Sequence, residues 1–275
     1  MIKAEPAIAL PPSHQKALQR AVMNLENQDF AARLADYAGR PIARAMRLMP
    51  KAANDRINKI VETAILNALN IAIRSIEPQS KRPPARRTAS LLAGISGGVS
   101  GFVGIAALPI ELPVTTTLML RAIADIARHH GEDLSTLEAR LACVEVFALG
   151  APQADRQMGL GYYASRTLIS RLAANATSIL LERGTANVSA PVVSSLVGEI
   201  ATRFGFGVVV TERSAVSALP VLGAVGGATV NMIFMNHFQR VASGHFAIRK
   251  LERLHGQSVV RQLYQSYGSR PKIMR

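Results

Sequence analysis

Hydrophobic residues recur at helical spacing along most of the chain. Between residues 57 and 72 an apolar side chain occurs at every third or fourth position, which indicates an amphipathic helix with one buried face. Weaker stretches with the same period occur at residues 13–25, 114–130, 135–150, 155–183, 241–255 and 258–267. The alternation of apolar and polar residues that marks a half-buried strand is not convincing anywhere. The pattern therefore predicts an all-α fold.

Two segments without a formal charge, residues 89–110 and 214–238, stand out from this pattern. At a rise of ~1.5 Å per residue, each is long enough to cross a ~30 Å hydrocarbon layer. Glycines at four-residue spacing let two helix backbones approach closely. We expect a multi-helix bundle around these two central glycine-rich apolar helices. The residues expected to pack there are Gly94, Gly97, Gly98, Gly101, Gly223, Gly227 and Asn231.

Helix ends and a linker divide the chain further. Gly131 is expected to end the helix at residues 114–130, and Ser135 with Glu138 has the spacing of a capping box for the next helix. Three prolines and four basic residues at residues 78–88 cannot continue a helix and predict a linker. The predicted regions are an N-terminal helical region at residues 1–77, the basic Pro-rich linker at 78–88, a helical core at 89–268 and a basic tail at 269–275.

The net charge of +14 lies outside the two uncharged segments. Residues 1–88 hold 15 Lys/Arg against 7 Asp/Glu, and residues 239–275 hold 8 against 1, whereas residues 122–212 hold 7 against 9. This distribution suits either a two-span hairpin or a peripheral protein whose ends rest on anionic lipid. A soluble bundle that buries both segments also stays open. The expected membrane-surface residues are Lys81, Arg82, Arg86, Arg87, Arg249, Lys250 and Arg253.

The sequence gives weaker signals for the cellular compartment and for catalytic or metal-binding residues. A single cysteine, Cys143, and an N-terminal stretch without a signal-peptide core lead us to expect a cytoplasmic protein, peripheral or integral at the inner membrane. Weak catalytic candidates are Glu111, Arg121, Asp125 and His129, although pairing or helix capping explains them better. We expect no metal and no cofactor, because no HExxH, cysteine pair or glycine fingerprint occurs.

Other polar groups also suggest structural roles. Asn231, Asn236 and His237 interrupt the second uncharged segment, and we expect them to hold neighbouring helices in register rather than to bind a substrate. Nucleic acid is an improbable partner because the basic stretches lack interleaved aromatic residues.

The order of several motifs is similar to that in a known family. These are the Glu111-Leu112-Pro113 step, a helix that ends at Gly131 before an acidic-Leu pair, and a late segment with Pro220, Gly223, Gly227 and Asn231 that leads into a basic helix. Over residues 55–257 the chain resembles the EcsC family of bacterial proteins. The family is named for an accessory protein encoded beside an ABC transporter. The resemblance implies a helical, membrane-linked protein and supplies no catalytic residues.

The sequence thus leads to a functional expectation with alternatives. The first is a non-enzymatic, membrane-associated helical accessory protein, linked to transport or to lipid and envelope processes. Its partner would be an anionic membrane surface or a membrane protein complex, with a lipid as a further candidate ligand. The alternatives are a hydrolase acting on lipid or peptide, and a lipid-binding module whose apolar helices line a cavity.

Overall fold

The regular elements of the described structure are helices. The computed structural model describes residues 10–26, 90, 108–150, 161–167, 170–171 and 223–268, and no strand occurs among them. The predicted all-α fold is therefore confirmed. The main helices are α1 (Pro12–Leu25), α5 (Leu108–His129), α6 (Leu137–Leu149), α11 (Gly223–His255) and α12 (Gln257–Gly268). A short helical stretch at residues 162–167 lies between α6 and α11 in the chain.

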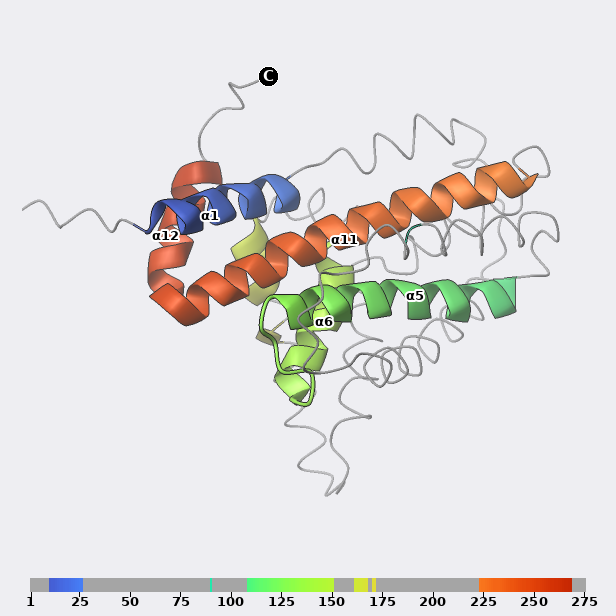
Figure 1. Cartoon of the computed structure of the whole chain (residues 1–275), viewed down its shortest axis with the longest axis horizontal. Coiled ribbons are helices and arrows are strands. Elements are labelled where there is room, and N and C mark those ends of the chain that lie inside the picture. The colour runs from blue at the N-terminus through green and yellow to red at the C-terminus, as the bar shows by residue number, and fades with distance from the viewer. Residues whose placement is uncertain are drawn as a thin grey trace, which may run out of the picture.

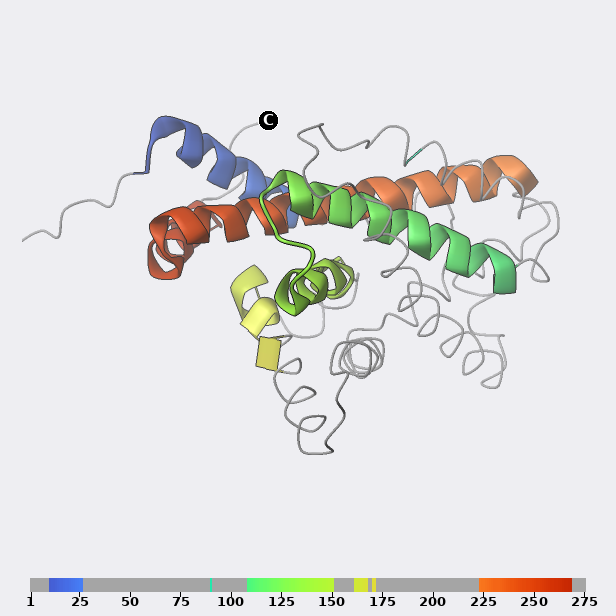
Figure 2. The ribbon, with the colours of Figure 1, turned by 60° about the horizontal axis from the view of Figure 1, so that its bottom comes forward.

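The 33-residue helix α11 is the centre of this arrangement (Figure 1). Each of α1, α5, α6 and α12 packs against it. In Figure 2, as in Figure 1, α1 lies on one side of α11 and α6 lies on the other. Helix α12 turns back beside α1 at the C-terminal end of α11. We call the side of α11 that carries α1 the α1 flank, and the side that carries α6 the α6 flank.

Two helices begin or continue differently from what the pattern predicted. The uncharged segment at residues 214–238 and the basic helix at residues 241–255 were expected as separate elements, but residues 223–238 of the first and all of the second belong to α11. Buried residues continue across the join, and neither proline nor glycine interrupts it. Helix α5 begins at Leu108 instead of after Pro113. Pro109 lies in its first turn, where the missing amide hydrogen would have no helical partner anyway.

Helix α5 ends at His129, and Gly131 terminates it as predicted. This glycine has a φ of 84° and donates its amide hydrogen to the carbonyl of Arg128 at 2.9 Å, while the amide of Glu132 reaches the carbonyl of Ala127 at 3.1 Å. The two bonds form a Schellman motif, which needs a residue at positive φ and therefore favours glycine. The motif turns the chain so that Glu132 points towards α11, where the candidate site lies.

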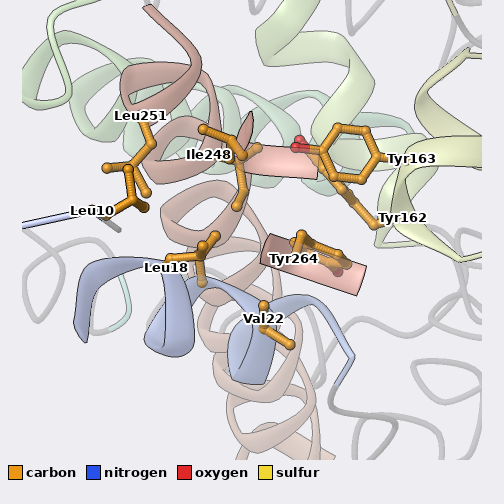
Figure 3. Close-up of a cluster of buried hydrophobic side chains, with 10 residues drawn as sticks. Leu10, Leu18, Val22, Tyr162, Tyr163, Ile248, Leu251 and Tyr264 are labelled. Carbon is orange, nitrogen blue, oxygen red and sulfur yellow. The ribbon is translucent and has the colours of Figure 1, made fainter. Parts of the chain in front are cut away.

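A cluster of buried side chains joins α1, α11, α12 and the helical stretch at residues 162–167 (Figure 3). In the close-up, Leu18 and Val22 of α1 point towards Ile248 of α11 and Tyr264 of α12. Helix α1 thus shares a core with the C-terminal helices, although the sequence pattern placed it in a separate N-terminal region. The predicted linker at residues 78–88 lies outside the described residues.

Close backbone approach through glycine occurs, but at glycines that the sequence pattern did not single out. A Cβ on Gly244 of α11 would lie 2.7 Å from Cγ of Leu25 and 3.0 Å from the carbonyl oxygen of Ala21, both contributed by α1. A Cβ on Gly150 would lie 2.6 Å from the ring of Phe238. These glycines let α1 and the end of α6 lie close against α11.

The packing of the predicted glycine pairs stays a prediction. Residues 94–101 lie outside the described residues, as do the surroundings of residues 223–227. A contact between the two uncharged segments is nevertheless present, because the hydroxyl of Ser90 donates to Oδ1 of Asn236 at 2.9 Å.

Candidate functional site

The loop between α5 and α6 forms one wall of the candidate site. Oδ1 of Asp133 accepts hydrogen bonds from the amide of Ser135 at 3.0 Å and from its hydroxyl at 2.7 Å. Thr136 then caps α6, since its hydroxyl oxygen accepts the amide hydrogen of Ala139 at 3.2 Å. The predicted capping box is therefore wrong by one residue. Ser135 is held by Asp133, and Glu138 turns towards α11.

An open cleft of about 430 Å³ lies between this loop, the start of α6 and the C-terminal part of α11. Most of the side chains that line it are charged. They include Glu132, Glu138, Arg166, Arg249, Glu252 and Arg253. The charges of this cleft are largely paired with one another.

Glu132 is the centre of the first group of pairs. Its carboxylate receives Nε of Arg249 at 2.9 Å and also pairs with Arg253, while a second nitrogen of Arg249 lies 2.9 Å from Glu138. Only 5% of the Glu132 side chain is exposed. Burial alone would raise the pKa of Glu132, but the hydrogen bonds and charges of the two arginines outweigh it and lower that pKa. Glu132 is thus held ionised by two permanent cations.

These pairs change the expected role of the basic residues on α11. Arg249 was predicted to meet a membrane surface, but its side chain is only 12% exposed and is committed to two carboxylates. Arg253 is 42% exposed and also donates to the carbonyl oxygen of His130 at 2.7 Å. Lys250 is exposed. The predicted surface residues of the linker lie outside the described residues.

A second group of pairs surrounds Glu252. Its carboxylate accepts a hydrogen bond from Arg166 at 2.7 Å and one from the hydroxyl of Tyr163 at 2.9 Å. Arg166 also lies 3.5 Å from the hydroxyl of Tyr162. This last contact connects the cleft to a more deeply buried set of polar groups.

That buried set is a chain of three side chains on three helical segments. The hydroxyl of Tyr162 lies 3.0 Å from Nδ1 of His245, and Nε2 of His245 lies 3.6 Å from Oε2 of Glu145. Burial raises the pKa of Glu145 to about 7 and lowers the pKa of His245 well below its usual value. Within the described residues, Oε2 of Glu145 and Nε2 of His245 have no hydrogen-bond partner, so the two atoms face each other alone.

Glu145 and His245 can hold one proton between them in two arrangements, although their facing atoms, 3.6 Å apart, are too far apart for a hydrogen bond. With the proton on Glu145, the acid faces Nε2 and the neutral imidazole donates from Nδ1 to Tyr162. With the proton on His245, the hydrogen on Nε2 faces a carboxylate. Both arrangements carry one proton for the pair, and the shifts in pKa favour the neutral one. Because both side chains are buried, this proton is held inside the bundle and not at the cleft surface.

Three of the four catalytic candidates from the sequence do not take part in this site. Arg121 and His129 are exposed on α5, and Asp125 pairs with Arg128 at 2.7 Å. None of these residues lines the cleft. The side chain of Glu111 lies outside the described residues. Among the residues that the structure describes, no three His, Cys, Asp or Glu side chains are grouped so that they could hold a metal ion.

One expected structural role is visible in the contacts. Nε2 of His237 donates to the carbonyl oxygen of Gly150 at 2.8 Å, and burial lowers the pKa of His237 to about 4. A neutral His237 thus ties α11 to the end of α6. Asn231 is also buried.

Sequence reasoning missed Glu145 and His245, although both carry a recognisable signal. Glu145 is the one charged residue between Leu141 and Leu149, and His245 lies inside an apolar stretch of α11. A lone ionisable group in an apolar run must find a partner or become neutral when it is buried. The identity of that partner depends on which helices meet.

The described part of the chain defines a class of protein: an all-α bundle on one long central helix, with a charged cleft and a buried Glu–His pair. None of the described helices combines the length and hydrophobicity that a bilayer crossing requires. The family's sequence model matches residues 13–251, and the chain belongs to the EcsC protein family. The match begins well before residue 55 and so includes most of α1. No curated protein and no solved structure matches the chain.

Proposed function

We propose that the protein is a non-enzymatic accessory protein that binds peripherally to the anionic cytoplasmic face of the inner membrane. The observation that carries this proposal is the sign of the exposed charges at the C-terminal end of α11. On α1, on the last turns of α11 and on α12, every exposed charged side chain that the structure describes is basic. These residues are Lys16, Arg20, Lys250, Arg253 and Arg261.

The two acidic residues that the structure describes in this region are both half-buried and engaged in hydrogen bonds. Glu26, which follows α1, accepts a hydrogen bond from the hydroxyl of Tyr264 at 2.5 Å. Glu252 is turned towards Arg166 and Tyr163, and its side chain is only 9% exposed. The positive surface is therefore a product of the fold as well as of the composition.

The expected electrostatic attraction between these basic residues and an anionic bilayer is large enough to contribute to binding. Each basic residue near an anionic bilayer contributes about 1 kcal/mol, and salt screens that contribution within roughly 10 Å. Within the part of the chain that the structure describes, four of the exposed residues pair with no carboxylate, whereas Arg253 shares Glu132. We therefore expect roughly 4 kcal/mol of gross attraction at low ionic strength.

The charged cleft favours neither alternative function. A lipid-binding module needs apolar walls around the acyl chains, but charged side chains line the cleft. A hydrolase needs its acid or base within hydrogen-bond reach of a substrate, but Glu145 and His245 are buried away from the cleft.

Co-sedimentation with vesicles tests the proposal. We expect the protein to pellet with vesicles that contain phosphatidylglycerol at low salt, to stay in solution with pure phosphatidylcholine, and to leave the anionic vesicles at high salt. Protein that stays in the supernatant with anionic vesicles at low salt would contradict lipid binding. If it still binds native membranes under those conditions, a membrane protein complex is the partner instead. Retention on membranes after alkaline carbonate washing would show integral attachment.

A further inference from the structure

The two faces of α1 differ sharply. Leu18, Ala21 and Val22 are between 0% and 7% exposed and pack into the shared core. The opposite face carries Lys16, Gln19, Arg20 and Met23, all of them exposed. Their spacing of three and four residues places them on one stripe of the helix.

Helix α1 is held firmly with this stripe facing outwards. Gly244 admits the backbone of α1 against α11, because a side chain there would meet Leu25 and the carbonyl of Ala21. At the other end of α1, Nδ1 of His14 lies 2.7 Å from Nε2 of His255. The stripe is therefore presented by a docked helix and needs no folding step on binding.

The stripe also faces away from the acidic residues of the cleft. Figures 1 and 2 place α1 on the flank of α11 opposite α6, and the cleft with Glu132, Asp133 and Glu138 lies on the α6 flank. No acidic residue occurs within α1 itself. The charge that α1 itself presents is thus positive, and the carboxylate that follows it, Glu26, is half-buried and accepts a hydrogen bond from Tyr264.

Met23 adds an apolar group to this positive stripe. Its side chain is 62% exposed, more than either of the other large exposed hydrophobic residues that the structure describes, Val114 and Leu254. Basic residues beside an exposed apolar side chain are typical of helices that lie in the headgroup region of a bilayer.

We infer that the outward stripe of α1 is the bilayer-contact surface, with Lys16 and Arg20 at the anionic headgroups and Met23 at the boundary of the acyl chains. This inference rests on the proposed membrane association and names its surface and its partner, an anionic lipid bilayer. A helix of 14 residues laid flat would contact the membrane over about 21 Å.

The absence of tryptophan from the sequence allows a site-specific test. In the full-length chain, Met23→Trp introduces one fluorophore on the stripe, and Val114→Trp introduces one at an exposed position on α5 as a matched control. With phosphatidylglycerol vesicles we expect a blue shift of the Met23→Trp emission and quenching by brominated acyl chains. We expect neither change for Val114→Trp.

Charge reversal provides a second measurement. The double variant Lys16→Glu/Arg20→Glu and its control Arg121→Glu/Arg171→Glu change the net charge equally, and all four positions are exposed. Reversal on α1 should weaken vesicle binding by at least about tenfold more than the control does, since nearby charges dominate within a Debye length. Circular dichroism establishes that both variants keep their helices.

The outcomes separate the two proposals. Wild-type protein that does not bind anionic vesicles contradicts the proposed function. Wild-type binding combined with an unshifted Met23→Trp emission, or with equal losses in the two double variants, overturns the assignment of α1 and leaves peripheral binding to another surface.

Discussion

On the α6 flank of α11, Arg249 and Arg253 face carboxylates, whereas on the α1 flank Lys16 and Arg20 face solvent. Both flanks carry basic residues, but those on the α1 flank are the ones that remain exposed and available to a binding partner. The comparison shows that a count of Lys and Arg along the sequence cannot locate a binding surface. The acidic residues that the fold brings nearby decide which cations remain available.

The α6 flank also contains two carboxyl groups that respond to burial in opposite ways. Glu132 has a lowered pKa because two arginines, which cannot lose their protons, surround it. Glu145 has a raised pKa because burial outweighs the charges of Arg166 and Arg249. Burial acts on both groups, and the hydrogen-bonded arginines reverse its effect only at Glu132.

The largest effect is expected from breaking the charge balance of the α6 flank. Glu132→Gln leaves the charge of Arg249 poorly compensated at 12% exposure, and should lower the free energy of unfolding by about 3–4 kcal/mol. The control Glu138→Gln removes a carboxylate that is 81% exposed, and should cost less than about 1 kcal/mol. Urea denaturation measures both. Equal losses would show that Glu132 is not the centre of the network.

A somewhat smaller effect is expected from replacing one member of the buried pair Glu145 and His245. It is measured as the free energy of unfolding as a function of pH. In His245→Gln we expect the remaining Glu145 to keep the pKa of about 7 that burial gives it in the wild-type protein, against an unfolded value of about 4.5. Because that pKa is raised, the contribution of Glu145 to the free energy of unfolding is fully present below pH 4.5. It falls by about 3 kcal/mol as the pH rises to 7. In Glu145→Gln the remaining His245 has a lowered pKa, so stability falls as the pH drops below 6.5.

The reference for these curves is the double variant Glu145→Gln/His245→Gln. Relative to it, the wild-type curve should be nearly flat between about pH 4.5 and 6.5, since folded and unfolded pairs both hold one proton there. Single variants that follow the double variant at every pH would show that the two groups do not titrate as a pair.

The smallest effect concerns the packing of α1. Gly244→Ala forces Leu25 and the backbone of Ala21 away from α11, and should cost about 1–3 kcal/mol of unfolding free energy. Gly161→Ala is the matched control, because an added Cβ there meets no atom within 4 Å. If α1 is the membrane-contact element, Gly244→Ala should also weaken vesicle binding, and Gly161→Ala should not. Unchanged stability in Gly244→Ala would contradict the close contact of the two helices.

Helix type and several helix ends could be predicted from local patterns. The end of α5 at Gly131 and the break at Gly256 follow from the need for positive φ, which is a property of single residues. The N-cap of α6 was missed by one residue because Asp133 competes for the hydroxyl of Ser135. The continuity of α11 was missed because a change in polarity along the sequence resembles a boundary between elements.

The charged site could be predicted only in part. The isolated positions of Glu145 and His245 in apolar runs mark them as groups that need a partner, but 100 residues separate them in the chain. The same holds for Glu132 and Arg249, which are 117 residues apart. Periodicity gives the face of a helix on which a residue lies, and not the helix that will oppose that face.

The amino-acid order thus sufficed for the all-α class, for the family resemblance and for the excess of basic residues near the two ends, since these depend on composition and on spacing within a helix. Folding was needed to pair Arg249 with Glu132, to join Glu145 to His245 and to leave Lys16 and Arg20 exposed on α1. Hydrogen bonds and ion pairs act over a few ångströms, so residues far apart in the chain acquire their charge state and their accessibility only when the helices pack.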